Sequence, residues 1–207
     1  MILKPTLLRR TGVSLTCRHM AEQTRLEQVV SELLRLIGEN PDREGLRKTP
    51  ARVARALKYL TKGYAEDPKH VINNALFTED YSEMIVMKDV DFFSLCEHHI
   101  LPFFGRATIA YIPRHKIVGI SKLARLVDVY ARRLQVQERM TTQIATTLME
   151  ELDPLGVGVV LRAEHLCMRM RGVEKQNSVV VTSAMLGVFR THQETREEFM
   201  TLVNGTR

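Results

Sequence analysis

The chain has 207 residues and a net charge of +6, with 44% hydrophobic and 26% charged residues. That is enough for one ordinary domain with a core, and no apolar run approaches the ~18 residues of a membrane span. Three widely spaced cysteines do not form a disulfide framework, so we expect free thiols in a reducing, cytoplasmic compartment. The absence of Trp and the 6% aromatic content disfavour a nucleic-acid binder built on stacked rings. The positive charge alone would suit nucleic acid, an acidic membrane surface or a polyphosphate small molecule. Our expectation is neither nucleic acid nor membrane as a partner.

The first twenty residues carry Lys4, Arg9, Arg10 and Arg18 and no acidic residue. This composition resembles an organelle transit peptide. The alternative, which we prefer, is a disordered tail or extra residues upstream of a start at Met20. Residues 1–23 are accordingly predicted to be a flexible N-terminal extension, and Cys17 is given no role.

Two helices are predicted next, over residues 24–63. Apolar residues recur at helical spacing from Leu26 to Ile37, and Gly38 ends the run. Thr49 is a suitable N-cap with Pro50 in the first helical position, and Gly63 closes this second helix. Residues 64–207 are predicted to form the larger domain.

The larger segment alternates strand and helix patterns. We expect a loop over 64–83, strands over 84–90 and 106–112, a loop over 114–119, a helix from an N-cap at Ser121 to about 134, a helix over 137–152, strands over 157–171 and 178–189, and a short terminal helix. This order favours an α+β fold in which helices pack on one face of an antiparallel sheet.

The stretch Cys96-Glu97-His98-His99 places a thiol and an imidazole three residues apart. A helical turn or tight loop brings such positions together, so Cys96 and His99 could hold one metal ion. A third ligand is available at Cys167, because alternate residues of a strand over 157–171 would bring His165 and Cys167 to one face. Two thiolates and one imidazole suit zinc, and three protein ligands leave the fourth position of a catalytic site open.

The competing interpretation is that Cys167 is a buried core thiol and that the histidines only form hydrogen bonds. Spacing alone does not decide between the two interpretations. Glu97 has no role in either of them.

Several longer blocks of sequence are similar to the zinc-dependent (type IA) GTP cyclohydrolase I family. They are Ser94-Leu95-Cys96-Glu97-His98-His99, Pro102-Phe103, Gly105, Ala110-Tyr111-Ile112-Pro113, Gly119-Ile120-Ser121-Lys122-Leu123-Ala124-Arg125, Gln135-Val136-Gln137-Glu138-Arg139, His165-Leu166-Cys167 and Arg171-Gly172. These blocks follow the family's order over about residues 41–203. The resemblance implies the tunnelling fold, an antiparallel sheet with two long helices on one face, preceded by a helical N-terminal segment.

The resemblance also implies a reaction and a set of catalytic residues. The family converts GTP to 7,8-dihydroneopterin triphosphate and formate, the first step of tetrahydrofolate and tetrahydrobiopterin synthesis. One zinc ion per subunit would be bound by Cys96, His99 and Cys167, and would activate water for attack on C8 of guanine. His165 would be the general acid and His98 would assist proton transfer. Ser121 and Gln137 would handle the ribose.

The substrate contacts follow from the same resemblance. Glu138 would accept hydrogen bonds from the N1–H and 2-amino groups of guanine, although alone it would pass for an exposed acid in a first helical turn. Lys122, Arg125 and Arg171 would bind the triphosphate, with Arg52 and Arg55 as further members of this cradle. Lys122 and Arg125 are three residues apart on one predicted helix, so both can reach one anion.

The family's subunits form rings, and active sites lie at subunit boundaries. We therefore expect a homo-oligomer, a decamer of two pentameric rings. The alternative function is a non-catalytic nucleotide- or pterin-binding homologue on the same scaffold. Loss of a zinc ligand, His98 or His165 would favour this alternative, and all five residues are present. A related tunnelling-fold enzyme with other chemistry would need ligand or nucleophile patterns that this chain lacks.

Overall fold

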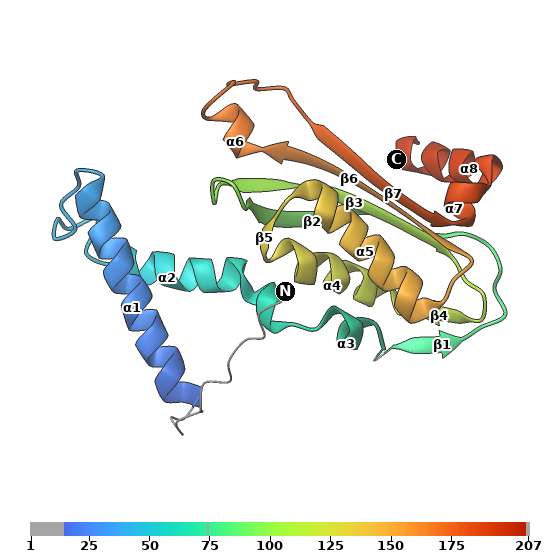
Figure 1. Ribbon diagram of the computed structural model, residues 1–207, viewed down its shortest axis with the longest axis horizontal. Helices are drawn as coiled ribbons and strands as arrows, with labels where there is room; N and C mark the ends of the chain where they lie inside the picture. Colours follow the sequence, from blue (N-terminus) through green and yellow to red (C-terminus); the bar gives the residue numbers. More distant parts are fainter. Residues whose placement is uncertain (1–14, 74, 206–207) are drawn as a thin grey trace, which may run out of the picture. The chain divides into compact units, whose positions relative to one another are not determined.

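The computed structural model describes residues 15–73 and 75–205, with side chains from residue 22 onward. The chain divides into a smaller unit that ends at Tyr59 and a larger unit that begins at Leu60. Figure 1 shows the elements of both units. Within the described residues, no helix combines the length and the apolar character needed to cross a bilayer.

The smaller unit is built from α1 (Leu15–Leu36) and α2 (Thr49–Leu60). Helix α1 begins eleven residues before Leu26, where the sequence pattern placed its start, because the segment from Leu15 contains neither Gly nor Pro to interrupt it. Residues 15–23 of the predicted extension are therefore helical, and residues 1–14 lie outside the described part. Gly38 ends α1 as predicted: its φ is 90°, and Glu39 N donates to Leu34 O at 2.9 Å.

The larger unit opens with a 3-10 turn, η1 (Lys62–Ala65), followed by α3 (Pro68–Asn73) and β1 (Leu76–Thr78). The predicted loop over 64–83 was therefore wrong in these places. Asp67 caps α3 through its Oδ1, which accepts from Lys69 N at 3.0 Å, and Pro68 takes the first helical position. Strand β1 pairs with β4 (Lys116–Val118), inside the second predicted loop. Strands of three residues are too short to show an alternating pattern.

Gly63 has a different role from the helix stop that the sequence predicted. Its N–H donates to Arg132 O at 3.0 Å, and a Cβ at this position would lie 2.1 Å from Val129 O. Only glycine allows the η1 turn to approach the backbone of residues 129–132 this closely. This contact ties η1 to the larger unit.

One five-stranded sheet forms the centre of the larger unit. It consists, in spatial order, of β5 (Leu134–Gln135), β2 (Ile85–Cys96), β3 (Pro102–Ile112), β6 (Gly156–His165) and β7 (Val180–Gly187). All neighbours are antiparallel except β2 and β5. Strand β2 is longer than the predicted 84–90, and the register between β2 and β3 shifts between Met87 and Val90, beside Asp89 with its φ of 56°.

Helices α4 (Ile120–Ala131) and α5 (Gln137–Leu152) pack on one face of the sheet (Figure 1), which confirms the predicted α+β class. The bounds of α5 agree with the prediction. Helix α4 is N-capped by Gly119, so Ser121 lies in its first turn and the predicted cap was wrong. Helix α4 also ends at Ala131, before 134, because Leu134 and Gln135 pair with β2 instead.

Side chains of successive residues in β3 and β6 enter two different cores. Ile109 and Val159 face α4 and α5, whereas Ala110 and Val160 pack on the opposite face. The second core is closed by Phe189, Phe199 and Val203 from α7 (Val188–Thr191) and α8 (Gln193–Asn204). The remaining short helix, α6 (Leu166–Arg169), follows β6 directly. Cys167 therefore lies in a helical turn, and its predicted place in a strand was wrong.

Candidate active site

The sequence-predicted trio Cys96, His99 and Cys167 comes together in the structure. One ligand atom from each residue lies within 4.8 Å of the other two, and no other such group of His, Cys, Asp or Glu occurs among the described residues. The Cys96 Sγ is 3.9 Å from the His99 Nδ1. The ligand atoms of a tetrahedral zinc site lie about 3.5 to 4 Å apart, so the spacing and the donor set both fit zinc.

Cys96 ends β2, and the following turn brings His99 back toward it. Ile100 N donates to Cys96 O at 2.8 Å, and Cys96 N donates to Leu101 O at 2.9 Å. Ile100 takes a φ of 56°, an uncommon value for a β-branched residue. The turn is therefore held by main-chain bonds on both sides of the pair of candidate ligands.

The register of β3 with β6 supplies the third member of the trio. Phe103 lies opposite His165 in this pairing, and β6 ends at that residue. The turn of α6 that follows carries Cys167 toward Cys96. Burial raises the pKa of the Cys167 thiol, and the nearby Cys96 thiol raises this pKa further. The raised pKa favours the protonated form of Cys167, and a metal ion that binds there would have to displace that proton.

His165 is held on one ring face and at one ring nitrogen. Its ring stacks on Phe103, with centroids 4.6 Å apart and an interplanar angle of 4°. Its Nε2 lies 2.8 Å from Gln137 Oε1. Burial lowers the pKa of His165 below its ordinary value, and the negative charge of Glu138 partly opposes this shift.

Gln137 is almost completely buried, and its amide is anchored to the sheet. Its Nε2 lies 3.2 Å from Leu161 O, 3.1 Å from Val180 O and 3.1 Å from Thr182 Oγ1. Two of these partners are carbonyl oxygens, which only accept, so the amide nitrogen must face them. Gln137 Oε1 therefore accepts a hydrogen bond from His165. Sequence reasoning named Gln137 but did not find this contact, which depends on the register of β6 and β7.

Two further predicted residues lie beside the trio. His98 Nδ1 is 3.6 Å from Cys96 Sγ, and Arg171 Nη1 donates to His99 Nε2 at 2.8 Å. Both His98 and Arg171 are exposed, so each can reach a bound molecule. Arg171 is the only predicted phosphate-binding residue for which the described part of the chain shows a contact with a candidate metal ligand.

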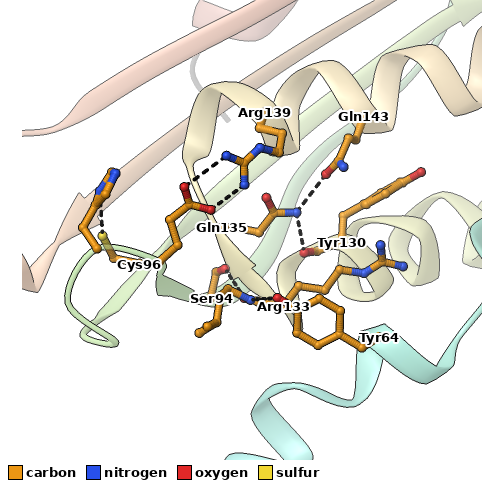
Figure 2. Close-up of polar contacts among 11 residues, drawn as sticks. Tyr64, Ser94, Cys96, Tyr130, Arg133, Gln135, Arg139 and Gln143 are labelled. Carbon is orange, nitrogen blue, oxygen red and sulfur yellow. Dashed lines mark hydrogen bonds and ion pairs between the residues drawn. The ribbon is translucent and has the colours of Figure 1, made fainter. Parts of the chain in front are cut away.

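Glu97, left without a role by the sequence, pairs with Arg139. The guanidinium donates to both carboxylate oxygens, at 2.5 Å and 3.1 Å (Figure 2). Hydrogen bonding to Arg139 lowers the pKa of Glu97. No sequence signal pointed to this pair, because the two residues belong to different elements forty-two positions apart.

Ser121, Lys122 and Arg125 lie far from the trio within one chain. They belong to α4, which follows β4, and Val118 N donates to the Tyr111 hydroxyl at 3.1 Å. Tyr111 pairs with Val157, eight positions along β6 from His165, a distance of roughly 25 Å. The first turn of α4 and the candidate metal ligands are therefore at opposite ends of the sheet.

The remaining predicted residues lie on two other helices. Glu138 is exposed in the first turn of α5, directly after Gln137. Arg52 and Arg55 are exposed on α2, in the smaller unit.

Fold and site together define a class: an α+β protein with a candidate metal centre of two thiols and one imidazole, beside a histidine that an anchored amide orients. The family model for GTP cyclohydrolase I matches residues 26–204. The chain belongs to the GTP cyclohydrolase I family.

Close relatives cover most of the chain. GTP cyclohydrolase 1 of Porphyromonas gingivalis is 57% identical over 184 residues, which are 89% of this chain and 95% of the relative. The protein of the same name from Leptospira biflexa is 57% identical over 86% of this chain and 97% of its own. The protein of that name from Chlorobium chlorochromatii is 59% identical over 86% of this chain and 80% of its own length. Among solved structures, the match to the apo form of the archaeosine synthase QueF-Like covers 50% of this chain and 93% of that chain, with 18% identity and a TM-score of 0.43.

Proposed function

We propose that this protein hydrolyses and rearranges GTP to 7,8-dihydroneopterin triphosphate and formate, the first step of tetrahydrofolate and tetrahydrobiopterin synthesis. The observation that carries the proposal is the meeting of Cys96, His99 and Cys167 beside His165, in a chain that belongs to the GTP cyclohydrolase I family. The non-catalytic alternative is not favoured, because every residue whose loss would suggest it is present.

Zinc is the metal that the donor set fits, and we assign Cys96, His99 and Cys167 as its protein ligands, with one ion per subunit. Bound by these residues, zinc would provide the activation of water that hydrolysis at C8 of guanine needs at neutral pH. The protein's part is to hold the three ligand atoms within reach of one another. The main-chain bonds of the turn after Cys96 support this function.

His165 is the proposed proton donor to N7 of guanine as the ring opens. Its Nε2–H is directed to Gln137, so Nδ1 is the atom that exchanges a proton with the substrate. His98, exposed next to Cys96, assists proton transfer in the later steps. Gln137 acts on the reaction through His165, a more specific role than the ribose handling that the resemblance implied.

Glu138 is the proposed reader of the guanine edge. A carboxylate accepts from N1–H and the 2-amino group together, and adenine offers no such pair of donors. ATP would therefore leave the charge of Glu138 without partners, which selects for GTP. Its position one residue after Gln137 supports this role, since it links guanine recognition to the histidine that protonates the ring.

The triphosphate and ribose contacts require a second copy of the chain. Arg171 lies at the metal ligands, whereas Ser121, Lys122 and Arg125 lie at the other end of the sheet. We propose that these three residues serve the site of a neighbouring subunit, with Arg52 and Arg55 as further phosphate contacts. Both outer strands support such an assembly: β7 is one edge of the sheet, and β5 covers β2 only at Leu95 and Cys96. A decamer of two pentameric rings, with the tunnelling fold in each subunit, would satisfy this requirement.

We place the protein in the cytoplasm, where thiols stay reduced. The free thiols of Cys96 and Cys167 support this placement, because a metal centre of this kind is lost when its cysteines oxidise.

The direct test incubates zinc-loaded protein with GTP at neutral pH and measures formate together with the fluorescence of the oxidised pterin. We expect both products to appear in equal amounts, and neither product from ATP. His165→Ala should keep zinc and GTP binding but lose turnover. If zinc-loaded protein forms neither product, the non-catalytic alternative takes the place of the enzyme.

A further inference from the structure

The exposed pair Glu97–Arg139 joins two parts of the candidate active site. The Arg139 guanidinium, on α5, donates to both oxygens of Glu97, the residue after Cys96; Figure 2 marks the contacts of Arg139 with dashed lines. Parallel bonds of this kind fix both the distance and the angle between two groups. A single bond to a lysine would fix only the distance.

The structure gives Glu97 a partner outside the candidate metal group. It is not a member of the candidate metal group formed by Cys96, His99 and Cys167. Both of its oxygens accept from Arg139, so the carboxylate is held against α5 and not against the metal group.

The two residues of the pair belong to segments with different proposed roles. Glu97 lies directly between the ligand Cys96 and His98, in the turn that also carries His99. Arg139 belongs to the first turn of α5, where it follows Gln137 and Glu138.

Main-chain hydrogen bonds also join the metal-ligand turn to the segment just before α5. Glu97 N donates to Gln135 O at 3.1 Å, and Cys96 pairs with Gln135 in the short β2–β5 ladder. Gln135 itself is anchored, because its Nε2 donates to Tyr130 O at 3.0 Å and to Gln143 Oε1 at 2.9 Å (Figure 2). The metal-ligand turn is thus attached by its backbone just before α5 and by a side chain in the first turn of α5.

We propose that Glu97 and Arg139 are positioning residues that hold the metal-ligand turn in register with the first turn of α5. The pair sets where the metal centre lies relative to the guanine carboxylate Glu138 and the His165 partner Gln137. This inference rests on the proposed function for the roles of Glu138 and His165. It does not depend on that function for the effect on metal retention.

The pair's exposure makes the proposal testable in folded protein. The side chains of Arg139 and Glu97 are 49% and 32% exposed, and ion pairs of this kind contribute little to global stability. Glu97→Gln and Arg139→Lys should therefore fold. A matched control exists in Glu39→Gln, because Glu39 accepts from Arg43 at 2.9 Å and 3.0 Å with side chains of similar exposure.

The experiment measures zinc release to a chromophoric chelator and the steady-state kinetics with GTP, for the wild type and the three variants. Replacing a group that orients a metal ligand typically lowers metal affinity or activity about 10-fold to 100-fold. We expect Glu97→Gln and Arg139→Lys to release zinc about 10-fold faster than the wild type. With zinc in excess, we expect kcat to fall about 10-fold, because the metal centre and Glu138 are no longer aligned. KM should change less than about twofold, because Glu138 is still present to bind guanine.

Glu39→Gln should match the wild type in both measurements. Zinc release at the wild-type rate from both site variants would overturn the proposal. Faster zinc release with an unchanged kcat would overturn the alignment with α5, and a lower melting temperature without faster release would reduce the pair to an ordinary surface contact. If the wild type itself fails to turn over GTP, the proposed function fails, while the zinc-release comparison still decides the role of the pair.

Discussion

Gln137 Oε1 lies 2.8 Å from His165 Nε2, and this contact determines which nitrogen of the histidine carries a hydrogen. The amide cannot turn over, because its Nε2 is within 3.2 Å of the carbonyl oxygens of Leu161 and Val180. Neutral His165 is therefore protonated at Nε2, and its Nδ1 is free to accept a proton. Stacking on Phe103 fixes the plane of the ring at the same time.

Replacing Gln137 with Met should remove the acceptor that selects the Nε2–H tautomer of His165. We expect turnover of GTP to fall about 100-fold, the lower range for a misplaced acid–base group, while zinc content and GTP affinity stay near the wild type. The ¹⁵N shifts of the His165 ring should change from one dominant tautomer to a mixture. Gln193→Met is the control, since Gln193 is exposed on α8 and its amide contacts Glu197. Wild-type shifts in the Gln137 variant would contradict the anchoring role.

Helix α5 shows how far local sequence predicts this fold. Its apolar residues Met140, Ile144 and Leu148 recur every four positions and are all fully buried in the main core. Such a stripe specifies a helix and its buried face without knowledge of the partner. The predicted bounds of α5 therefore agree with the structure, whereas the three-residue strands β1 and β4 carried no pattern and were missed.

The candidate site was predicted only in part, for a similar reason. Residue types and spacing indicated Cys96, His99 and Cys167, and the structure brings them together. The supporting contacts of Gln137 with His165 and of Glu97 with Arg139 arise from strand register and from helix placement on the sheet. Such contacts join segments far apart in the chain, so no local pattern encodes them.

Cys167→Ala should remove bound zinc. The change leaves one thiolate and one imidazole, and two ligands do not make a stable zinc site. Metal analysis of purified protein should give about one zinc per chain for the wild type and for the control Cys17→Ala, and close to none for Cys167→Ala. Full occupancy in the Cys167 variant would show that the ligand assignment is wrong.

Glu138→Gln should weaken the preference for guanine. The amide keeps one acceptor but places an N–H donor against the donors of the guanine edge, so one charge-assisted hydrogen bond is lost and a repulsive contact is gained. We expect kcat/KM for GTP to fall about 100-fold, with a smaller fall for inosine triphosphate, which lacks the 2-amino group. Competition kinetics with the two nucleotides measures the difference. Equal losses for both would argue against recognition of the 2-amino group by this carboxylate.

Glu151 links α5 to α3 and gives the fold a defined acid sensitivity. Its carboxylate accepts from Asn73 Nδ2 at 2.7 Å and pairs with Lys69 Nζ at 3.0 Å, and these partners lower its pKa from the ordinary value of 4.5. A carboxyl whose pKa is depressed by folding stabilises the native state above its unfolded pKa, and this stabilisation is lost as the pH falls through the folded pKa. Glu151→Gln should therefore be less stable than the wild type near pH 7, and the difference should shrink below about pH 4.5.

Urea unfolding of the zinc-free proteins between about pH 7 and pH 3 measures this difference without a contribution from metal loss. Glu150→Gln serves as the control, since Glu150 meets the same Lys69 at 3.3 Å from a more exposed position and has no contact with Asn73. We expect its unfolding midpoint to follow the wild type more closely at every pH, because an exposed ion pair contributes little. The urea midpoint of Glu151→Gln could instead stay below that of the wild type by the same amount from pH 7 to pH 3. That result would show that the charge of the carboxylate does not stabilise the α3–α5 contact.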